Sequence, residues 1–115
     1  MRKMQLLFLV IKRVDLVDDV MVALAKAGIK GGTSIDSVGM AKSISTSDSM
    51  ASLGLLNSIL KGVDPKQKGK TVFVAVDDSK VDDAIAAIKR ITGDLSKPNA
   101  GVLFTVPITY WEGLD

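Results

Sequence analysis

VDDVMVALAKAG, residues 17–28, is echoed further along the chain by VDDAIAAIKRITG, residues 81–93. In both stretches apolar side chains recur at i, i+3, i+4 and i+7, the spacing of one apolar stripe on a helix. Asp15 and Ser79 precede the two stretches and are the expected N-caps, and a glycine ends each stretch. The sequence therefore predicts two amphipathic helices of the same design.

An apolar run that suits a β-strand precedes each predicted helix, and another follows it. The preceding runs are MQLLFLVI from Met4 and KTVFVAV from Lys70, and the following runs lie around residues 33–38 and 102–106. The order is strand, helix, strand, written twice. We therefore predict an α+β fold, a ferredoxin-like double βαβ with an antiparallel four-stranded sheet and a long insertion between strands two and three.

The crossover rule predicts the order of the strands in this sheet. Right-handed crossovers are expected to place strands one and three side by side and parallel in the middle. Strands two and four are then the edges, and Pro107 at the end of strand four suits an edge, where its missing N–H has no partner to lose. Two helices cover one face of the sheet, and we expect another copy of the chain to cover the other.

The link between strands two and three, residues 39–69, is far longer than a hairpin needs. Loops of this length inside a compact domain are usually functional. Its first part, GMAKSISTSDS, is polar and is expected to be flexible, whereas MASLGLLNSILKG suits a short helix. This helix either docks into the groove of a partner protein or packs on its own assembly and completes the core. Its apolar face comprises Met50, Leu53, Leu56 and Leu60.

The composition limits the classes of function. The 115 residues suit a single domain, 1–115, and a formal net charge of +2 gives no reason to expect nucleic acid. The chain has neither cysteine nor histidine, so it lacks thiolate chemistry, the commonest general base and the commonest metal ligand. Paired aspartates lie at helix starts, where the helix dipole explains them. We expect no catalytic site and no metal site.

The N-terminal apolar run, residues 6–11, is too short to span a bilayer. Charged residues follow it, rather than the small residues that suit signal-peptide cleavage. We interpret it as a buried strand of a cytoplasmic protein that does not insert into membranes.

The ferredoxin-like core, the long insertion and the Thr-Gly loop before strand four together resemble the P-II signal-transduction proteins. Residues 16–33 are similar to the family's first helix and its Gly-x-x-Gly-x-Thr exit, and Gly39 matches the glycine that opens the family's T-loop. Residues 71–94 resemble its third strand, its second helix and the start of its basal loop. The resemblance covers nearly the whole chain.

This resemblance implies a cytoplasmic homotrimer whose sheets face inward and which binds adenine nucleotides in clefts between subunits. ATP, ADP and AMP are the candidate ligands, and no cofactor is required. The T-loop would contact a target such as a membrane transporter or a metabolic enzyme. On the same resemblance the nucleotide-binding residues are Gly31, Thr33, Gly39, Lys68, Lys70, Thr92, Gly93, Asp94, Lys97 and Gly101.

The chain also departs from the family's pattern. Its basal loop lacks the family's Ile-Gly-Asp-Gly-Lys, so Lys97 is the candidate for the missing charge, and the family's C-terminal Arg-x-Arg is absent. The only tyrosine, Tyr110, lies outside the insertion, which makes uridylylation implausible. Ser43 stands roughly where the family has the glutamine that helps bind 2-oxoglutarate and magnesium. We therefore expect a divergent P-II-like protein rather than a nitrogen sensor.

Simpler explanations exist for each candidate site. Residues 92–101 also suit a helix C-cap followed by a Pro-Asn turn, Lys68 and Lys70 a solvated start of a strand, and residues 31–33 a plain turn. The main hypothesis is a non-enzymatic regulator that binds a small effector at subunit interfaces and controls a partner through residues 39–69.

Two rival functions remain open. One is a ligand-independent trimeric adaptor that uses the insertion helix as a permanent docking element. The other is an ion-tolerance protein like CutA, which Trp111 suggests, although the lack of histidine and cysteine argues against soft-metal binding.

Overall fold

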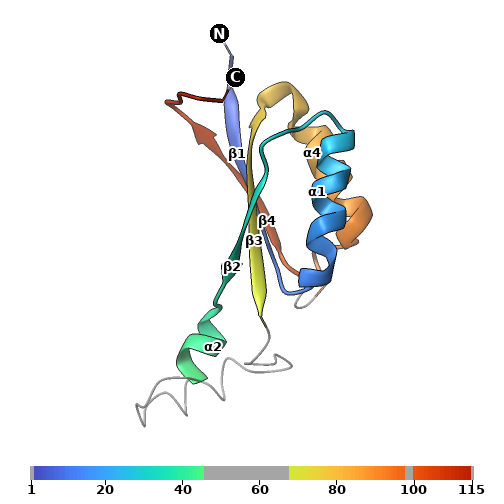
Figure 1. Cartoon of the computed structure of the whole chain (residues 1–115), viewed down its shortest axis with the longest axis vertical. Coiled ribbons are helices and arrows are strands. Elements are labelled where there is room, and N and C mark those ends of the chain that lie inside the picture. Colours follow the sequence, from blue (N-terminus) through green and yellow to red (C-terminus); the bar gives the residue numbers. More distant parts are fainter. Residues whose placement is uncertain (1, 46–67, 98–99, 115) are drawn as a thin grey trace.

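The computed structural model describes residues 2–45, 68–97 and 100–114. Within these ranges, one sheet with the strand order β2-β3-β1-β4 carries two long helices on one face (Figure 1). The strands are β1 (Met4–Ile11), β2 (Thr33–Ser37), β3 (Gly69–Asp77) and β4 (Val102–Ile108). The helices are α1 (Val17–Lys26), α2 (Met40–Ser45) and α4 (Val81–Thr92), with 3-10 turns η1 (Val14–Leu16) and η2 (Asp78–Lys80).

The predicted ferredoxin-like fold is confirmed, but one detail of the predicted sheet is wrong. Strands β1 and β3 are neighbours in the middle, yet they are antiparallel, with Phe8 opposite Phe73. The helical crossovers make β1 parallel to β2 and β3 parallel to β4, and neither of these pairs is adjacent. Since β3 returns directly beside β2, it must run against both β2 and β1. Pro107 lies on the edge strand β4, as predicted.

Both long helices end just before the predicted glycines, α1 at Lys26 and α4 at Thr92, but they begin differently from the prediction. Asp15 does not cap α1; its carboxylate pairs with Arg13 at 2.7 Å, and the turn η1 leads into the helix instead. Ser79 does not cap α4 either, because its amide and hydroxyl both donate to Asp77 at 3.0 and 2.8 Å. A 3-10 turn precedes each helix, and neither α1 nor α4 has a side-chain cap of its own; ahead of α4 the cap is Asp77, at the start of η2.

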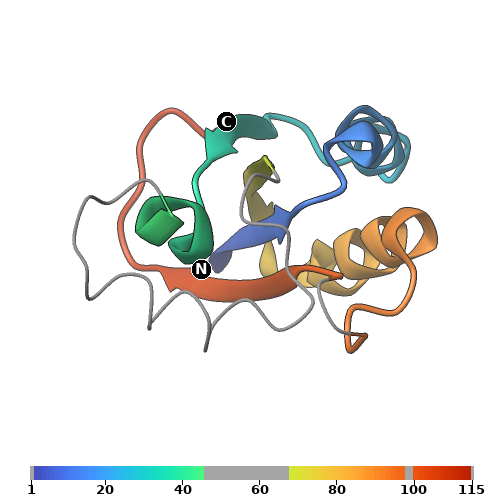
Figure 2. The same ribbon diagram turned by 90° about the horizontal axis from the view of Figure 1, so that it is seen from below.

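The start of the insertion is helical, which corrects the expectation of a flexible polar segment. Helix α2 follows directly on Gly39, whose carbonyl accepts a hydrogen bond from the amide of Ser43 at 3.0 Å. Figures 1 and 2 show α2 beyond the lower end of the sheet, on the side away from α1 and α4. The predicted helix with Met50, Leu53, Leu56 and Leu60 lies outside the described residues.

The two faces of the sheet are both apolar, but α1 and α4 cover only one of them. The core lies between the covered face and the helices. Its largest fully buried side chains are Leu7, Leu9, Ile11, Val72 and Val74 from the sheet, and Val20 and Ile88 from the helices. The opposite face carries a row of three aromatic rings. The ring of Phe8 stacks on that of Phe104 with 5.0 Å between the ring centroids, and its centroid lies 6.3 Å from that of Phe73. We call this second face the open face; on it, Val102 and Phe104 are 56% and 44% exposed.

Candidate functional site

A cationic pocket lies where the insertion leaves and rejoins the sheet. The pocket has a volume of about 290 Å³ and is lined by Val14, Asp36, Ser37, Val38, Lys42, Lys68, Gly69 and Lys70. Three lysines against one aspartate give its lining a net positive charge. Such a lining suits a small anion, since lysine offers ammonium donors to carboxylate or phosphate oxygens.

Contacts between β2 and β3 hold the two ends of the insertion next to each other at this pocket. Ser37 is the register partner of Gly69, and the hydroxyls of Ser37 and Thr71 share a hydrogen bond of 2.5 Å. One step further into the sheet, Asp36 faces Lys70, with the carboxylate Oδ1 4.0 Å from the ammonium Nζ. We call residues 36–37 and 69–71 the neck. The neck holds the lysines of the pocket at a defined place on the sheet.

The loop between α4 and β4, residues 93–101, forms a second candidate region, here called the basal loop. Its first turn is built by Asp94, whose carboxylate accepts hydrogen bonds from the hydroxyl and the amide of Ser96 at 2.7 and 2.9 Å. These two bonds hold the pKa of the Asp94 carboxyl below its ordinary value. Asp94 therefore shapes the loop rather than projecting as a free ligand, and Thr92 donates to the carbonyl of Gly93 at 3.2 Å.

Gly101 brings the basal loop back onto the end of β1. It has φ of +137°, and a Cβ added there would lie 2.8 Å from the carbonyl oxygen of Val10 and 2.9 Å from a methyl group of Ile11. Beside it is a cavity of about 580 Å³ along the edge strand β4. The cavity is lined by Ile85, Lys89, Asp94, Leu95, Ser96, Gly101, Val102, Leu103, Phe104 and Thr105. Glycine is thus required where the loop meets the sheet.

The strand order separates the predicted site residues into two groups within one chain. Lys68 and Lys70 line the neck pocket on the β2 edge, and Gly39 follows directly on the pocket residue Val38. The other group comprises Thr92 at the end of α4 and Gly93, Asp94, Lys97 and Gly101 in the basal loop. This loop leads into β4 on the opposite edge, at the same end of the sheet (Figure 1). β1 and β3 lie between the two groups.

The remaining two predicted residues lie away from both groups. Gly31 has a positive φ of 86° in the turn before β2, and Thr33 pairs with Phe73 halfway along β3. Sequence reasoning missed Asp36 and Lys42 as members of the neck pocket. Only the strand register places Asp36 opposite Lys70.

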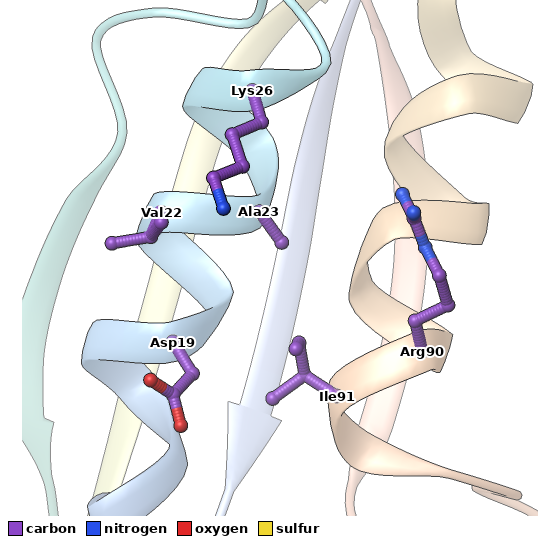
Figure 3. Close-up of a pocket in the computed structure, with 6 residues that line it drawn as sticks. All are labelled: Asp19, Val22, Ala23, Lys26, Arg90 and Ile91. Carbon is purple, nitrogen blue, oxygen red and sulfur yellow. The ribbon is translucent and has the colours of Figure 1, made fainter.

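A third hollow lies on the outer surface of the helices and contains none of the predicted residues. It is a groove of about 290 Å³ between α1 and α4, lined by Asp19, Val22, Ala23, Lys26, Arg90 and Ile91. Figure 3 shows the basic side chains of Lys26 and Arg90 on opposite walls of this groove. It shares no residue with the neck pocket or with the basal loop.

The described residues offer neither a metal site nor a membrane-spanning helix. Residues 2–45, 68–97 and 100–114 contain no cluster of three or more acidic side chains placed to hold a metal ion. Across that same part of the chain, every helix is too short or too polar to span a membrane.

Comparison with known proteins identifies the fold. No family model matches the sequence, and no curated protein matches it either. Among solved structures, the chain is similar to the PII protein of Arabidopsis thaliana bound to citrate, with a TM-score of 0.63 and 19% identity. The similarity covers 92% of this chain and 78% of that one. The P-II-like fold predicted from the sequence is therefore confirmed, and at this level of identity the likeness is one of fold.

Proposed function

We propose that this protein is a non-enzymatic cytoplasmic regulator that binds a small anionic effector at the neck pocket and controls a partner protein through the 39–69 insertion. The observation that carries the proposal is that Lys42, Lys68 and Lys70 line one pocket at the root of that insertion. An effector held there touches both ends of the insertion at once. An adenine nucleotide, ATP, ADP or AMP, is the first candidate, and citrate is the second because the similar PII protein was solved with it.

The proposed assembly is a homotrimer with the open faces turned inward. The apolar open face, with the rings of Phe8, Phe73 and Phe104 in a row, supports this arrangement because exposed apolar surface of this kind favours association. Assembly would also bring the neck on the β2 edge of one copy towards the basal loop on the β4 edge of the next. The two groups of candidate residues that one chain keeps apart would then form one cleft.

The effector would act by shifting a population. A ligand that binds one arrangement of the insertion more tightly than another changes the proportion of the two, and it can shift that equilibrium only by this difference in affinity. The neck is joined by the hydroxyl hydrogen bond of Ser37 with Thr71 and by the strand pairing of Ser37 with Gly69, so the change is expected in the insertion rather than in the sheet. A partner that recognises one arrangement, such as a transporter or a metabolic enzyme, would then respond to the effector.

Ligand-dependent thermal unfolding tests the proposal. We expect one of ATP, ADP, AMP and citrate, near millimolar, to raise the unfolding midpoint by several degrees, since a ligand at 100 times its dissociation constant stabilises by about 2.7 kcal/mol. Lys68→Gln with Lys70→Gln should abolish the shift. The matched control is Lys3→Gln, which removes an exposed lysine just before β1, away from the neck pocket, and should leave the shift unchanged.

The opposite result would change the functional class. If none of the four ligands shifts the midpoint, the effector hypothesis fails and the ligand-independent adaptor becomes the better explanation of the insertion. If the shift survives in the doubly substituted variant, the ligand binds elsewhere than at the neck.

A further inference from the structure

The neck pocket already contains a negative charge of its own. The carboxylate of Asp36 lies 4.0 Å from the ammonium of Lys70, and among the described residues this is the ion pair that engages Lys70. The Asp36 side chain is 92% exposed, whereas that of Lys70 is 37% exposed. The Asp36 side chain is thus mostly in solvent, whereas the Lys70 side chain is more enclosed by the pocket.

We propose that Asp36 is a built-in competitor of the effector, which makes the neck pocket selective for anions with two or more negative charges. This inference rests on the proposed function, since it concerns the same pocket. A ligand oxygen that binds the Lys70 ammonium therefore competes with the Asp36 carboxylate for the same charge. At Lys70 a single carboxylate would exchange one ion pair for an equal one, and a lone contact with another exposed lysine is worth about 1 kcal/mol at most, too little for measurable binding.

A polyanion can bind more tightly than a single carboxylate because the pocket has lysines besides Lys70. While one anionic group replaces Asp36 at Lys70, a second can reach Lys68, which has no ion pair within the described part of the chain. Lys42 lines the same pocket from α2. The shared chemistry of the ligand is therefore a cluster of negative oxygens, either a polyphosphate such as that of ATP or a polycarboxylate such as citrate.

The position of Asp36 also links this exchange to the insertion. Asp36 is the second-last residue of β2, which ends at Ser37. The insertion begins directly after that strand. When Lys70 turns to the ligand, the charged tie between β2 and β3 is released. The hydroxyl bond between Ser37 and Thr71 lies on the other face of the strands and keeps the sheet closed. The ligand would thus alter the root of the insertion without opening the fold.

Isothermal titration of the full chain with ATP, citrate and acetate tests the inference. Asp36→Asn removes the competing charge and should tighten the binding of ATP or citrate by roughly two- to fivefold, the range expected for an exposed ion pair. Acetate should show no saturable binding to the wild type. Asp19→Asn is the matched control, because it removes the same charge from the helix groove outside the neck and should leave the affinity unchanged.

A double substitution separates competition at Lys70 from a general change in charge. In a Lys70→Gln background, Asp36→Asn should produce no further gain, since the two side chains act through one contact. A gain of equal size in that background would overturn the inference, as would a wild-type affinity for acetate equal to that for citrate.

The failures of the two proposals are distinguishable. If the wild type binds ATP or citrate and Asp36→Asn binds it no more tightly, the competitor inference falls while the proposed function stands. If neither the wild type nor Asp36→Asn binds either probe, the effector site itself is wrong and both proposals fall.

Discussion

The two faces of the sheet are built from alternate residues of the same strands, yet in the single chain only one of them is buried under helices. Leu7 and Leu9 of β1 are fully buried under α1 and α4, while Phe8 between them faces the other way. Both faces are apolar, so composition does not distinguish them. The helices decide which face becomes core, because both crossovers pass over the same side of the sheet (Figure 2).

This difference shows where the stability of the chain and the proposed assembly arise. Burial under the helices stabilises the individual fold. Burial of the open face, where Phe104 stacks on Phe8, is available only from outside the described chain. Substitutions on the two faces should therefore have different consequences, one in unfolding and the other in association.

The largest effect is expected on the covered face. Leu9→Ala empties a fully buried position and should lower the free energy of unfolding by about 2–5 kcal/mol, measured by guanidinium denaturation at fixed protein concentration. Val22→Ala on the outer surface of α1 should change it by less than about 0.5 kcal/mol. Equal losses for the two variants would show that the helices do not bury the core side as described.

A substitution at the centre of the open face should act on association instead. Phe104→Asp places a charge beside the ring of Phe8, and burying that charge between copies is strongly unfavourable. We expect light scattering after gel filtration to show single chains for the variant and a larger assembly for the wild type, with unchanged far-ultraviolet circular dichroism. The idea of a covered open face fails if both proteins elute with the same mass.

The smallest effect is expected for two valines that are almost equally exposed in the single chain. Val102 on the open face and Val22 on α1 are 56% and 53% exposed. If copies cover the open face, Val102→Thr should lower the unfolding midpoint by a few degrees, about 1 kcal/mol or less, because a buried methyl is replaced by a hydroxyl. Val22→Thr should leave it in place. Identical midpoints for the two variants would contradict the assembly.

Reasoning from the sequence was accurate where the signal was the periodicity of apolar residues. The repeated helix pattern, the four strand runs and the glycine stops of both helices are all found close to the predicted residues. Capping was less predictable, since Asp15 and Ser79 satisfy other partners and 3-10 turns start the helices. The parallel orientation predicted for β1 and β3 was wrong because crossover order alone does not state how the third strand returns.

The candidate site was only partly predictable for the same reason. Lys68 and Lys70 stand out in the sequence as lysines at the start of a strand, and both line the neck pocket. Asp36 carries no local signal. It belongs to the pocket because the pairing of β2 with β3 sets it opposite Lys70, more than thirty residues later in the chain. The predictions for Met50, Leu53, Leu56 and Leu60 concern residues outside the described part and stay predictions.

By itself the sequence determined the four strands and the two long helices, because helix and strand periodicity and glycine stops act over a few neighbouring residues. It also determined which chemistry is excluded, through the absence of histidine and cysteine. Only the tertiary structure decided which apolar face is core and which lysines share a pocket. It also separated the neck from the basal loop, at the same end of the sheet but on opposite edges. Those facts depend on strand order and register, which bring distant residues together and are not encoded in any single stretch of chain.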